Sequence, residues 1–330
     1  MFFPLLVTGA KSRTQSGFLQ ADRQVLICLL FLGLSLVLSG CGLLSTSPLL
    51  QTPGGPATAR VDEVPFFAQK ELQCGPAALA MALNWSGIDV QPSELTPEVF
   101  TPDLKGSLQS ALIGATRRHG RVAYAITGSE ALLAEVSAGN PVIVLVNLGL
   151  SWYPKWHYAV VIGFDREREE VILHSGLTAN EHLSSRVFLN IWRRGKYWGL
   201  LVLPPERLPA GVVEGDWLEA VAGLERADQW RGAEAGYSAA LKRWPKSFAA
   251  WMGLGNSRYS LHDFAGSAEA FRRATLLQPE NGIPFNNLAH VLNIQGKRNE
   301  ALVAAQRAVD LGGPLLGNFL QTLEEIKNKP

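Results

Sequence analysis

The sequence predicts two domains in series, an α+β domain over residues 61–205 and an all-α repeat solenoid over residues 216–330. In the first segment, candidate helices precede short apolar runs of strand length, which is an α+β order. In the second, small and aromatic residues recur every 34 positions along an alanine-rich helical stretch. The chain has 330 residues, 47% of them apolar, which is enough for two packed cores.

The first 40 residues are expected to be an export signal. Three basic residues precede an uncharged apolar stretch at 25–38, which has the length of a signal core and is short for a spanning helix. The stretch ends in Leu38-Ser39-Gly40-Cys41, with the small residues that a signal peptidase requires. Residues 41–60 are rich in Ser, Thr, Pro and Gly and are expected to form a flexible tether.

The first domain is expected to begin with an extended segment and then a helix that starts near Cys74. The pattern predicts two further helices at 104–120 and 129–139, followed by strands at 141–148, 157–164, 170–174 and 197–203. The charged residues 165–169 lie between two of these strands, which indicates a hairpin.

From residue 216 the sequence has the signature of tetratricopeptide repeats. Pro245 and Pro279 lie 34 apart, and Trp251-Met-Gly-Leu254-Gly255 has the expected Trp-x-x-Leu-Gly pattern. We expect about three repeats and a capping helix at 315–327, which is near the minimum for a stable stack. The alternative is an unrelated helical bundle.

Charge and histidine spacing exclude several classes of function. The formal net charge is +1 and the sequence contains no long basic run, so no nucleic-acid partner is expected. The histidines lack the paired spacing of a metal site, and no metal or other cofactor is expected.

Cysteine usage leaves one thiol for chemistry. Cys28 lies within the expected signal and Cys41 at its end, so Cys74 has no partner for a disulfide. Cys74 precedes Gly75, Pro76 and an apolar helical run, so its sulfur is expected at a helix N-terminus. The helix dipole there favours the thiolate, which is the nucleophilic form. The alternative is a small buried side chain without chemistry.

Among six histidines, His157 is the best candidate for a base. It opens a strongly apolar strand, so the scaffold would hold the ring while leaving one side accessible. His119 ends a helix, His262 falls in a turn between repeat helices, and His290 lies on the repeats. An ordinary half-exposed histidine at a strand edge remains the alternative for His157.

The tetrapeptide at 38–41 resembles the lipobox of bacterial lipoproteins. The resemblance implies that Cys41 is lipidated and becomes the mature N-terminus, which would anchor the protein to a membrane. An uncleaved anchor with an incidental Cys41 is the alternative. Gly42 rather than Asp implies the outer membrane in a Gram-negative cell, with the protein facing the periplasm of the cell envelope.

Over roughly 61–203, Gln69, Cys74-Gly75-Pro76 and His157-Tyr158 with Gly163-Phe164-Asp165 resemble papain-like cysteine peptidases of the bacteriocin-processing, double-glycine-leader group. The resemblance implies a papain-like fold, Cys74 as nucleophile and His157 as general base and acid. It also implies Gln69 as a donor to the oxyanion, a role for which the nearer Gln73 competes.

The residue that orients His157 is where the sequence departs from this group. The family places an Asp, in an Asp-Pro pair, at the end of the next strand, where this chain has His174-Ser175-Gly176. Ser175 occupies the Asp position, and its hydroxyl can accept a hydrogen bond but lacks the charge that stabilises imidazolium. His174 is an alternative, and Asp165 is expected to be a turn residue.

Three functions are compatible with this sequence. The first is a lipid-anchored cysteine peptidase whose repeats form a groove for a peptide or protein partner. The second is an inactive peptidase-fold scaffold for protein interactions, and the third is a thiol acyltransferase that uses the same acyl-enzyme. No phosphate-binding GxxxxGK[ST] loop of an exporter occurs in the chain.

Overall fold

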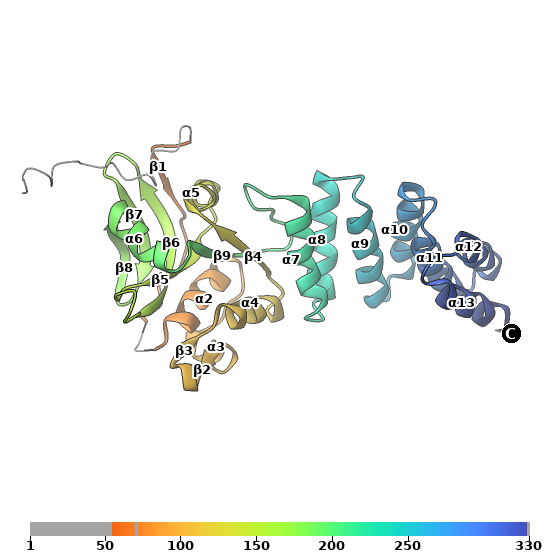
Figure 1. The fold of residues 1–330 in the computed structure, drawn as a ribbon, viewed down its shortest axis with the longest axis horizontal. Helices are drawn as coiled ribbons and strands as arrows, with labels where there is room; N and C mark the ends of the chain where they lie inside the picture. Colours follow the sequence, from red (N-terminus) through yellow and green to blue (C-terminus); the bar gives the residue numbers. More distant parts are fainter. Residues whose placement is uncertain (1–54, 70–71, 329–330) are drawn as a thin grey trace, which may run out of the picture. The chain divides into compact units, whose positions relative to one another are not determined.

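The structure is a computed structural model that describes residues 55–69 and 72–328 (Figure 1). These residues all belong to the unit Ser47–Pro330, one of two into which the chain divides. The expected signal at 1–40, the lipidation site Cys41 and the tether up to residue 54 lie outside the described residues. Within the described part, no helix is both long and apolar enough to cross a bilayer.

An antiparallel sheet forms the centre of the first part of the chain (Figure 1). Its strands run in the order β4-β9-β5-β6-β7-β8, and β1 pairs with the far end of β6, where Thr58 lies opposite Asp165. The described strands of this sheet are β1 (Thr58–Arg60), β4 (Val122–Thr127), β5 (Val142–Asn147), β6 (Trp156–Asp165), β7 (Glu170–Ser175), β8 (Thr178–Ser184) and β9 (Trp198–Leu203).

Helices cover both faces of the sheet, so its central strands are apolar on both sides. On β6, Val160 and Ile162 pack toward helix α2, while Ala159 and Val161 belong to the core of the opposite face. The helices on the first face are α2 (Cys74–Trp85), α3 (Pro92–Val99) and α4 (Gln109–Arg118). Those on the second are α5 (Ser129–Ser137), α6 (Ser185–Arg194) and α7 (Glu214–Glu225).

Helix α2 is apolar around its whole circumference, and nine of its twelve residues are buried. A helix of this kind is stable only inside a core, which is why it lies between the sheet and a small hairpin. The hairpin consists of β2 (Phe100–Thr101), the 3-10 turn η2 (Pro102–Leu104) and β3 (Gly106–Ser107). Gly75 is required here because a β-carbon at this position would collide with the Ser107 side chain.

Seven helices follow the sheet in the described part of the chain, and they pack as consecutive antiparallel neighbours (Figure 1). Large rings lie against glycines of the adjacent helix: Tyr237 contacts Gly253, and Phe271, 34 residues after Tyr237, contacts Gly255. The helices are α7, α8 (Trp230–Arg243), α9 (Phe248–Ser260), α10 (Phe264–Leu277), α11 (Gly282–Ile294), α12 (Arg298–Leu311) and α13 (Leu316–Asn328).

The core of the sheet continues into the first helices of this series. Trp217 and Leu224 of α7 and Leu254 of α9 belong to the same buried cluster as Val122 and Tyr124 of β4. Helices α10 to α13 form a separate core around Phe271, Leu288 and Leu323. The boundary between the two cores therefore lies within the repeats, because α7 packs on β4 and shares the core of the sheet.

The α+β domain followed by a repeat region is confirmed, as are the helix at 129–139, the predicted strands, the hairpin at 165–169 and the capping helix. The helix predicted at 104–120 begins only at Gln109, because Lys105 has a φ of +48° and residues 102–107 form the hairpin turn and β3. Strands β1, β4 and β8 and helices α3 and α6 were not predicted, and β1 shows that the expected tether at 41–60 is wrong at its end, where Thr58–Arg60 pairs with β6. The domain bounds 61–205 and 216–330 stay predictions.

Candidate functional site

Cys74 is the first residue of α2, and its sulfur lies at the edge of β6 beside the peptide bond that joins His157 to Tyr158. Burial raises the pKa of the Cys74 thiol, and backbone hydrogen bonds from Tyr158 and Gly75 lower it only in part. Burial therefore disfavours the thiolate in the resting protein, against the effect that we expected of the helix dipole.

The His157 ring is held by the residue that the motif assigns to this role. His157 Nε2 lies 3.1 Å from Ser175 Oγ, and Ser175 is the last residue of β7. Burial lowers the pKa of His157, so the imidazole is neutral at neutral pH. The hydrogen bond to Ser175 leaves the other ring nitrogen, Nδ1, for exchange of a proton.

The Gln69 side chain connects the strands that carry His157 and Ser175. Its Nε2 donates to the Tyr158 carbonyl oxygen at 3.1 Å, and its Oε1 accepts from the Gly176 N–H at 3.0 Å. The β6–β7 pairing ends at Val160 and His174, and its register, if continued, would place Tyr158 opposite Gly176. The Gln69 amide therefore replaces the missing backbone hydrogen bonds between β6 and β7. Its insertion spaces the two strands at the end where Ser175 contacts His157.

Gln69 and Gln73 differ in how their amides are used. Gln69 is buried, and one of its two amide hydrogens is committed to the Tyr158 carbonyl. Gln73 precedes the first turn of α2, and its Oε1 accepts from Thr96 Oγ1 at 3.1 Å. Each amide retains N–H groups that a substrate oxyanion can use, so Gln69 as the oxyanion donor, with Gln73 as its competitor, stays a prediction.

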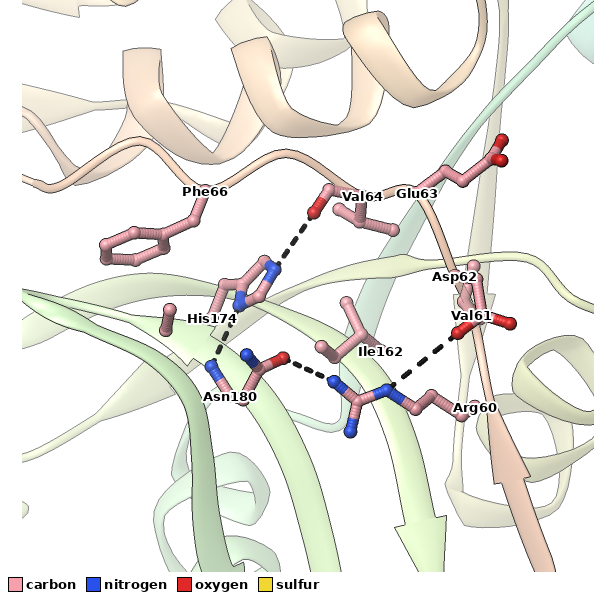
Figure 2. A pocket seen from close by; sticks show the side chains of 10 residues that line it. Arg60, Val61, Asp62, Glu63, Val64, Phe66, Ile162, His174 and Asn180 are labelled. Carbon is pink, nitrogen blue, oxygen red and sulfur yellow. Dashed lines mark hydrogen bonds and ion pairs between the residues drawn. The ribbon is translucent and has the colours of Figure 1, made fainter.

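His174 is not brought to His157. Its Nε2 donates to the Val64 carbonyl oxygen and its Nδ1 accepts from the Asn180 N–H, both at 3.1 Å (Figure 2). This pattern fixes a neutral tautomer, and burial lowers the pKa of the ring. His174 thus lines a polar cavity of about 260 Å³, where Arg60 donates to the Asn180 side chain at 2.7 Å. It fastens the segment before Gln69 to β7.

The remaining polar residues from the sequence analysis have structural partners. The Asp165 carboxylate accepts from the backbone N–H groups of Glu167 and Arg168, both at 3.0 Å, so it is the turn residue that we expected. His119 pairs with Glu98 at 2.9 Å and the exposed His290 with Tyr259 at 3.1 Å. His262 lies between α9 and α10 with a φ of +61°, as the turn prediction required.

Tyr158 is a residue of the site that sequence reasoning missed. Its hydroxyl donates to the Ser107 carbonyl oxygen at 3.1 Å, which joins β6 to the hairpin that packs on the start of α2. Burial raises the pKa of Tyr158, and the nearby Cys74 adds to this effect. Tyr158 follows His157 in the motif, and that adjacency was the only signal in the sequence.

A family model and a solved structure match the first part of the chain. Residues 61–198 match the model of the Peptidase_C39 like family. A C39-like peptidase structure from Bacillus anthracis is 20% identical over 44% of this chain and 98% of its own length, with a TM-score of 0.38.

Other similar proteins match the helical region. The TPR2B domain of yeast Sti1, solved in complex with pHsp70, is 13% identical over 36% of this chain and 98% of its own, with a TM-score of 0.34. The secretion chaperone SycD of Yersinia enterocolitica is 15% identical over 34% of this chain and 91% of its own, with a TM-score of 0.33. Superkiller complex protein 3 of Homo sapiens is 28% identical over 110 residues, which are 33% of this chain but 7% of that protein.

The family model covers α2 through the start of β9, which includes Cys74, His157 and Ser175. Residues 61–198 therefore match the Peptidase_C39 like family, and helices α7 to α13 follow them with the 34-residue spacing of tetratricopeptide repeats.

Proposed function

We propose that the protein is a cysteine peptidase that cleaves a peptide or protein substrate, with Cys74 as nucleophile and His157 as its acid and base. The observation that carries the proposal is the 3.1 Å contact between His157 Nε2 and Ser175 Oγ. The residue after His157 on β6, Tyr158, directs its backbone N–H at the Cys74 sulfur, so the ring and the thiol lie at the same end of the strand. A nucleophile beside a base that is oriented by a third group is the arrangement of covalent acyl transfer.

The reaction proceeds through an acyl-enzyme. The Cys74 sulfur forms a bond to the peptide carbonyl carbon while His157 takes the thiol proton. His157 then gives this proton to the departing amine as the carbon–nitrogen bond breaks. A water molecule, deprotonated by His157, attacks the thioester, the carbon–sulfur bond breaks, and Cys74 regains its proton.

The charge of the tetrahedral intermediate needs donors close to Cys74. The backbone at the start of α2, together with the side-chain amide of Gln69 or Gln73, supplies neutral N–H groups of the kind that stabilise an oxyanion. Neutral donors suit this site because the resting thiol and imidazole are both uncharged. A permanent positive charge there would instead stabilise the thiolate before substrate arrives.

We further propose that lipidation at Cys41 places the enzyme in the bacterial cell envelope, in the outer membrane facing the periplasm. The sequence Leu38-Ser39-Gly40-Cys41 supports the anchor. The tetratricopeptide-like helices would hold a peptide or protein partner, since stacks of this kind use an extended concave surface for binding.

The test is labelling of the full chain with a peptidyl epoxide, which forms a thioether with an activated cysteine. We expect the mass of one inhibitor on the peptide that contains Cys74, and none in Cys74→Ala. His157→Ala should slow labelling about 10²–10⁴-fold, the usual contribution of a general base. If native protein stays unlabelled at Cys74 while His157 is intact, the proposal fails.

A second candidate is a peptidase-fold scaffold without catalysis. Two observations favour this scaffold. The pKa of Cys74 is raised, and Ser175 offers a hydroxyl at the position where papain-like peptidases of the bacteriocin-processing group have a carboxylate. This candidate predicts that Cys74→Ala retains every phenotype of the wild-type gene, whereas changes on the repeat helices abolish it. A product that carries an added amine, detected by its mass, would instead indicate acyl transfer.

A further inference from the structure

The turn between β5 and β6 exposes large apolar side chains in an unusual concentration. Trp152 is 81% exposed, Tyr153 63% and Trp156 53%, and Leu148 and Leu150 are exposed beside them. We call these five residues the aromatic tip. Isolated exposed apolar residues are ordinary, but a contiguous set of this size marks a site of interaction.

Hydrogen bonds hold the backbone of the aromatic tip in place. The buried Asn147 accepts from the N–H groups of Gly149 and Lys155, both at 2.9 Å, and its amide nitrogen donates to the Leu150 carbonyl oxygen. Leu150 and Tyr153 form an isolated β-bridge, and Arg194 of α6 donates to the Gly149 carbonyl oxygen. The backbone that displays these rings is therefore ordered before any partner arrives, which lowers the entropic cost of binding.

The segments that form and support the aromatic tip contain basic but no acidic residues. No Asp or Glu occurs in residues 136–164, which include β5, the tip and most of β6, or in residues 182–205, which include α6 and β9. The same segments contain Lys155, which lies between Tyr153 and Trp156 of the tip, and Arg193, Arg194 and Lys196 at the end of α6 that contacts it. A surface with this charge is complementary to an anionic one.

The shape of the tip decides between an anionic lipid surface and a peptide. A peptide subsite surrounds its ligand with walls, whereas a Trp that is 81% exposed at the end of a hairpin projects away from its surroundings. Projecting Trp and Tyr rings with flanking Lys and Arg are the composition that partitions into the headgroup region of a bilayer.

We propose that the aromatic tip inserts into the interfacial region of an anionic lipid bilayer. Trp152 and Tyr153 enter the headgroup layer, and Lys155 with Arg193 contacts anionic headgroups. The proposal is independent of whether Cys74 is catalytic. Its consequence for the site is geometric, because Trp152 precedes His157 by only five residues, a chain distance of at most about 18 Å.

The experiment uses the full chain with vesicles whose acyl chains carry bromine, which quenches tryptophan at short range. Vesicles of phosphatidylcholine alone are compared with equal parts of phosphatidylcholine and phosphatidylglycerol. Subtracting the emission of Trp152→Phe from that of wild type isolates the signal of Trp152, and Trp251→Phe in α9 gives the matched control. This readout reports the position of Trp152 itself, so other membrane attachments of the chain do not produce it.

We expect the Trp152 signal to be quenched in the anionic vesicles and the Trp251 signal to be unchanged. Lys155→Gln with Arg193→Gln should weaken insertion about 25-fold, since each basic residue near an anionic surface contributes about a factor of five. Lys242→Gln with Lys246→Gln, which removes two exposed charges of the repeats, should have no effect. Thermal melting of each variant checks that it is folded.

Equal quenching of Trp152 and Trp251 in anionic vesicles would overturn the proposal. So would a Trp152 signal that lipid leaves unchanged but that an added apolar peptide shields from acrylamide, because the occupant would then be a polypeptide. Quenching that is the same with and without phosphatidylglycerol would contradict the assigned role of Lys155 and Arg193.

Discussion

The candidate site and the helical region are stabilised by contacts of different range. At the site, single hydrogen bonds join residues far apart in the sequence: Gln69 to Tyr158 and to Gly176, and Val64 to His174. In the helical region, rings pack on glycines of the next helix, as Tyr237 does on Gly253. The difference shows that the geometry of the site depends on a few hydrogen bonds, whereas the stability of the repeats depends on tightly packed apolar side chains.

The largest expected effect on stability comes from removing a packed aromatic ring from the repeats. Phe271→Ala should lower the free energy of unfolding by about 3–5 kcal/mol, because Phe271 is 2% exposed and fills the space above Gly255. Leu276→Ala, on the same helix but 73% exposed, is the control and should change little. Chemical denaturation measures both. A similar loss in both variants would mean that packing on glycine is not what stabilises the repeats.

The next effect tests the directional bonds. Gln69→Ala should cost about 1–3 kcal/mol, because it leaves the Gly176 N–H and the Tyr158 carbonyl without the Gln69 amide. Faster hydrogen exchange at the Gly176 N–H should accompany this loss. Gln73→Ala is the matched control and should leave that exchange rate unchanged. Unaltered protection of Gly176 in Gln69→Ala would show that the Gln69 amide does not hold the strands.

A smaller effect is expected at Ser175. Ser175→Ala should lower kcat/KM about fivefold, because one hydrogen bond that orients the His157 ring contributes about 1 kcal/mol. Ser175→Asp should raise the pKa of His157, since a carboxylate beside the ring favours imidazolium. Titration of the ring proton by NMR measures this shift, and an unchanged or lowered pKa would contradict the contact between the two side chains.

The smallest effect concerns the rate at which Cys74 reacts with iodoacetamide. Because burial holds its pKa above the ordinary value, the thiolate fraction at neutral pH is small and grows as pH rises. Alkylation of Cys74 should therefore be slower than that of an exposed cysteine and should increase steadily into alkaline solution. A plateau of high reactivity between about pH 5 and 8 would instead indicate a resting thiolate–imidazolium pair.

The sequence predicts those elements whose periodicity is strong. Strands β5 and β6 are long apolar runs, and the 34-residue spacing locates the repeat helices without any knowledge of packing. Strand β8 is different, because its residues Thr178–Ser184 are almost all polar and exposed. It exists because β7 offers an edge for pairing, and this is a property of the fold that local sequence does not contain.

For the site, the sequence predicts the motif residues but not the contacts that hold them. Motif order was enough to propose Cys74, His157 and Ser175, and the structure brings the last two within hydrogen-bond distance. The use of the Gln69 amide between strands could not be predicted, since it depends on where the β6–β7 pairing stops. The raised pKa of Cys74 could not be predicted either, because burial is a consequence of tertiary packing.

The core that β4 shares with α7 has a consequence for how such chains evolve. A solenoid needs a cover at each end, and here α13 covers one end while the sheet covers the other. A gene break between residues 205 and 214 would separate α7 from β4, with which it shares this core. Recombination would therefore retain the sheet and the first repeat as one heritable module, with later repeats free to be gained or lost.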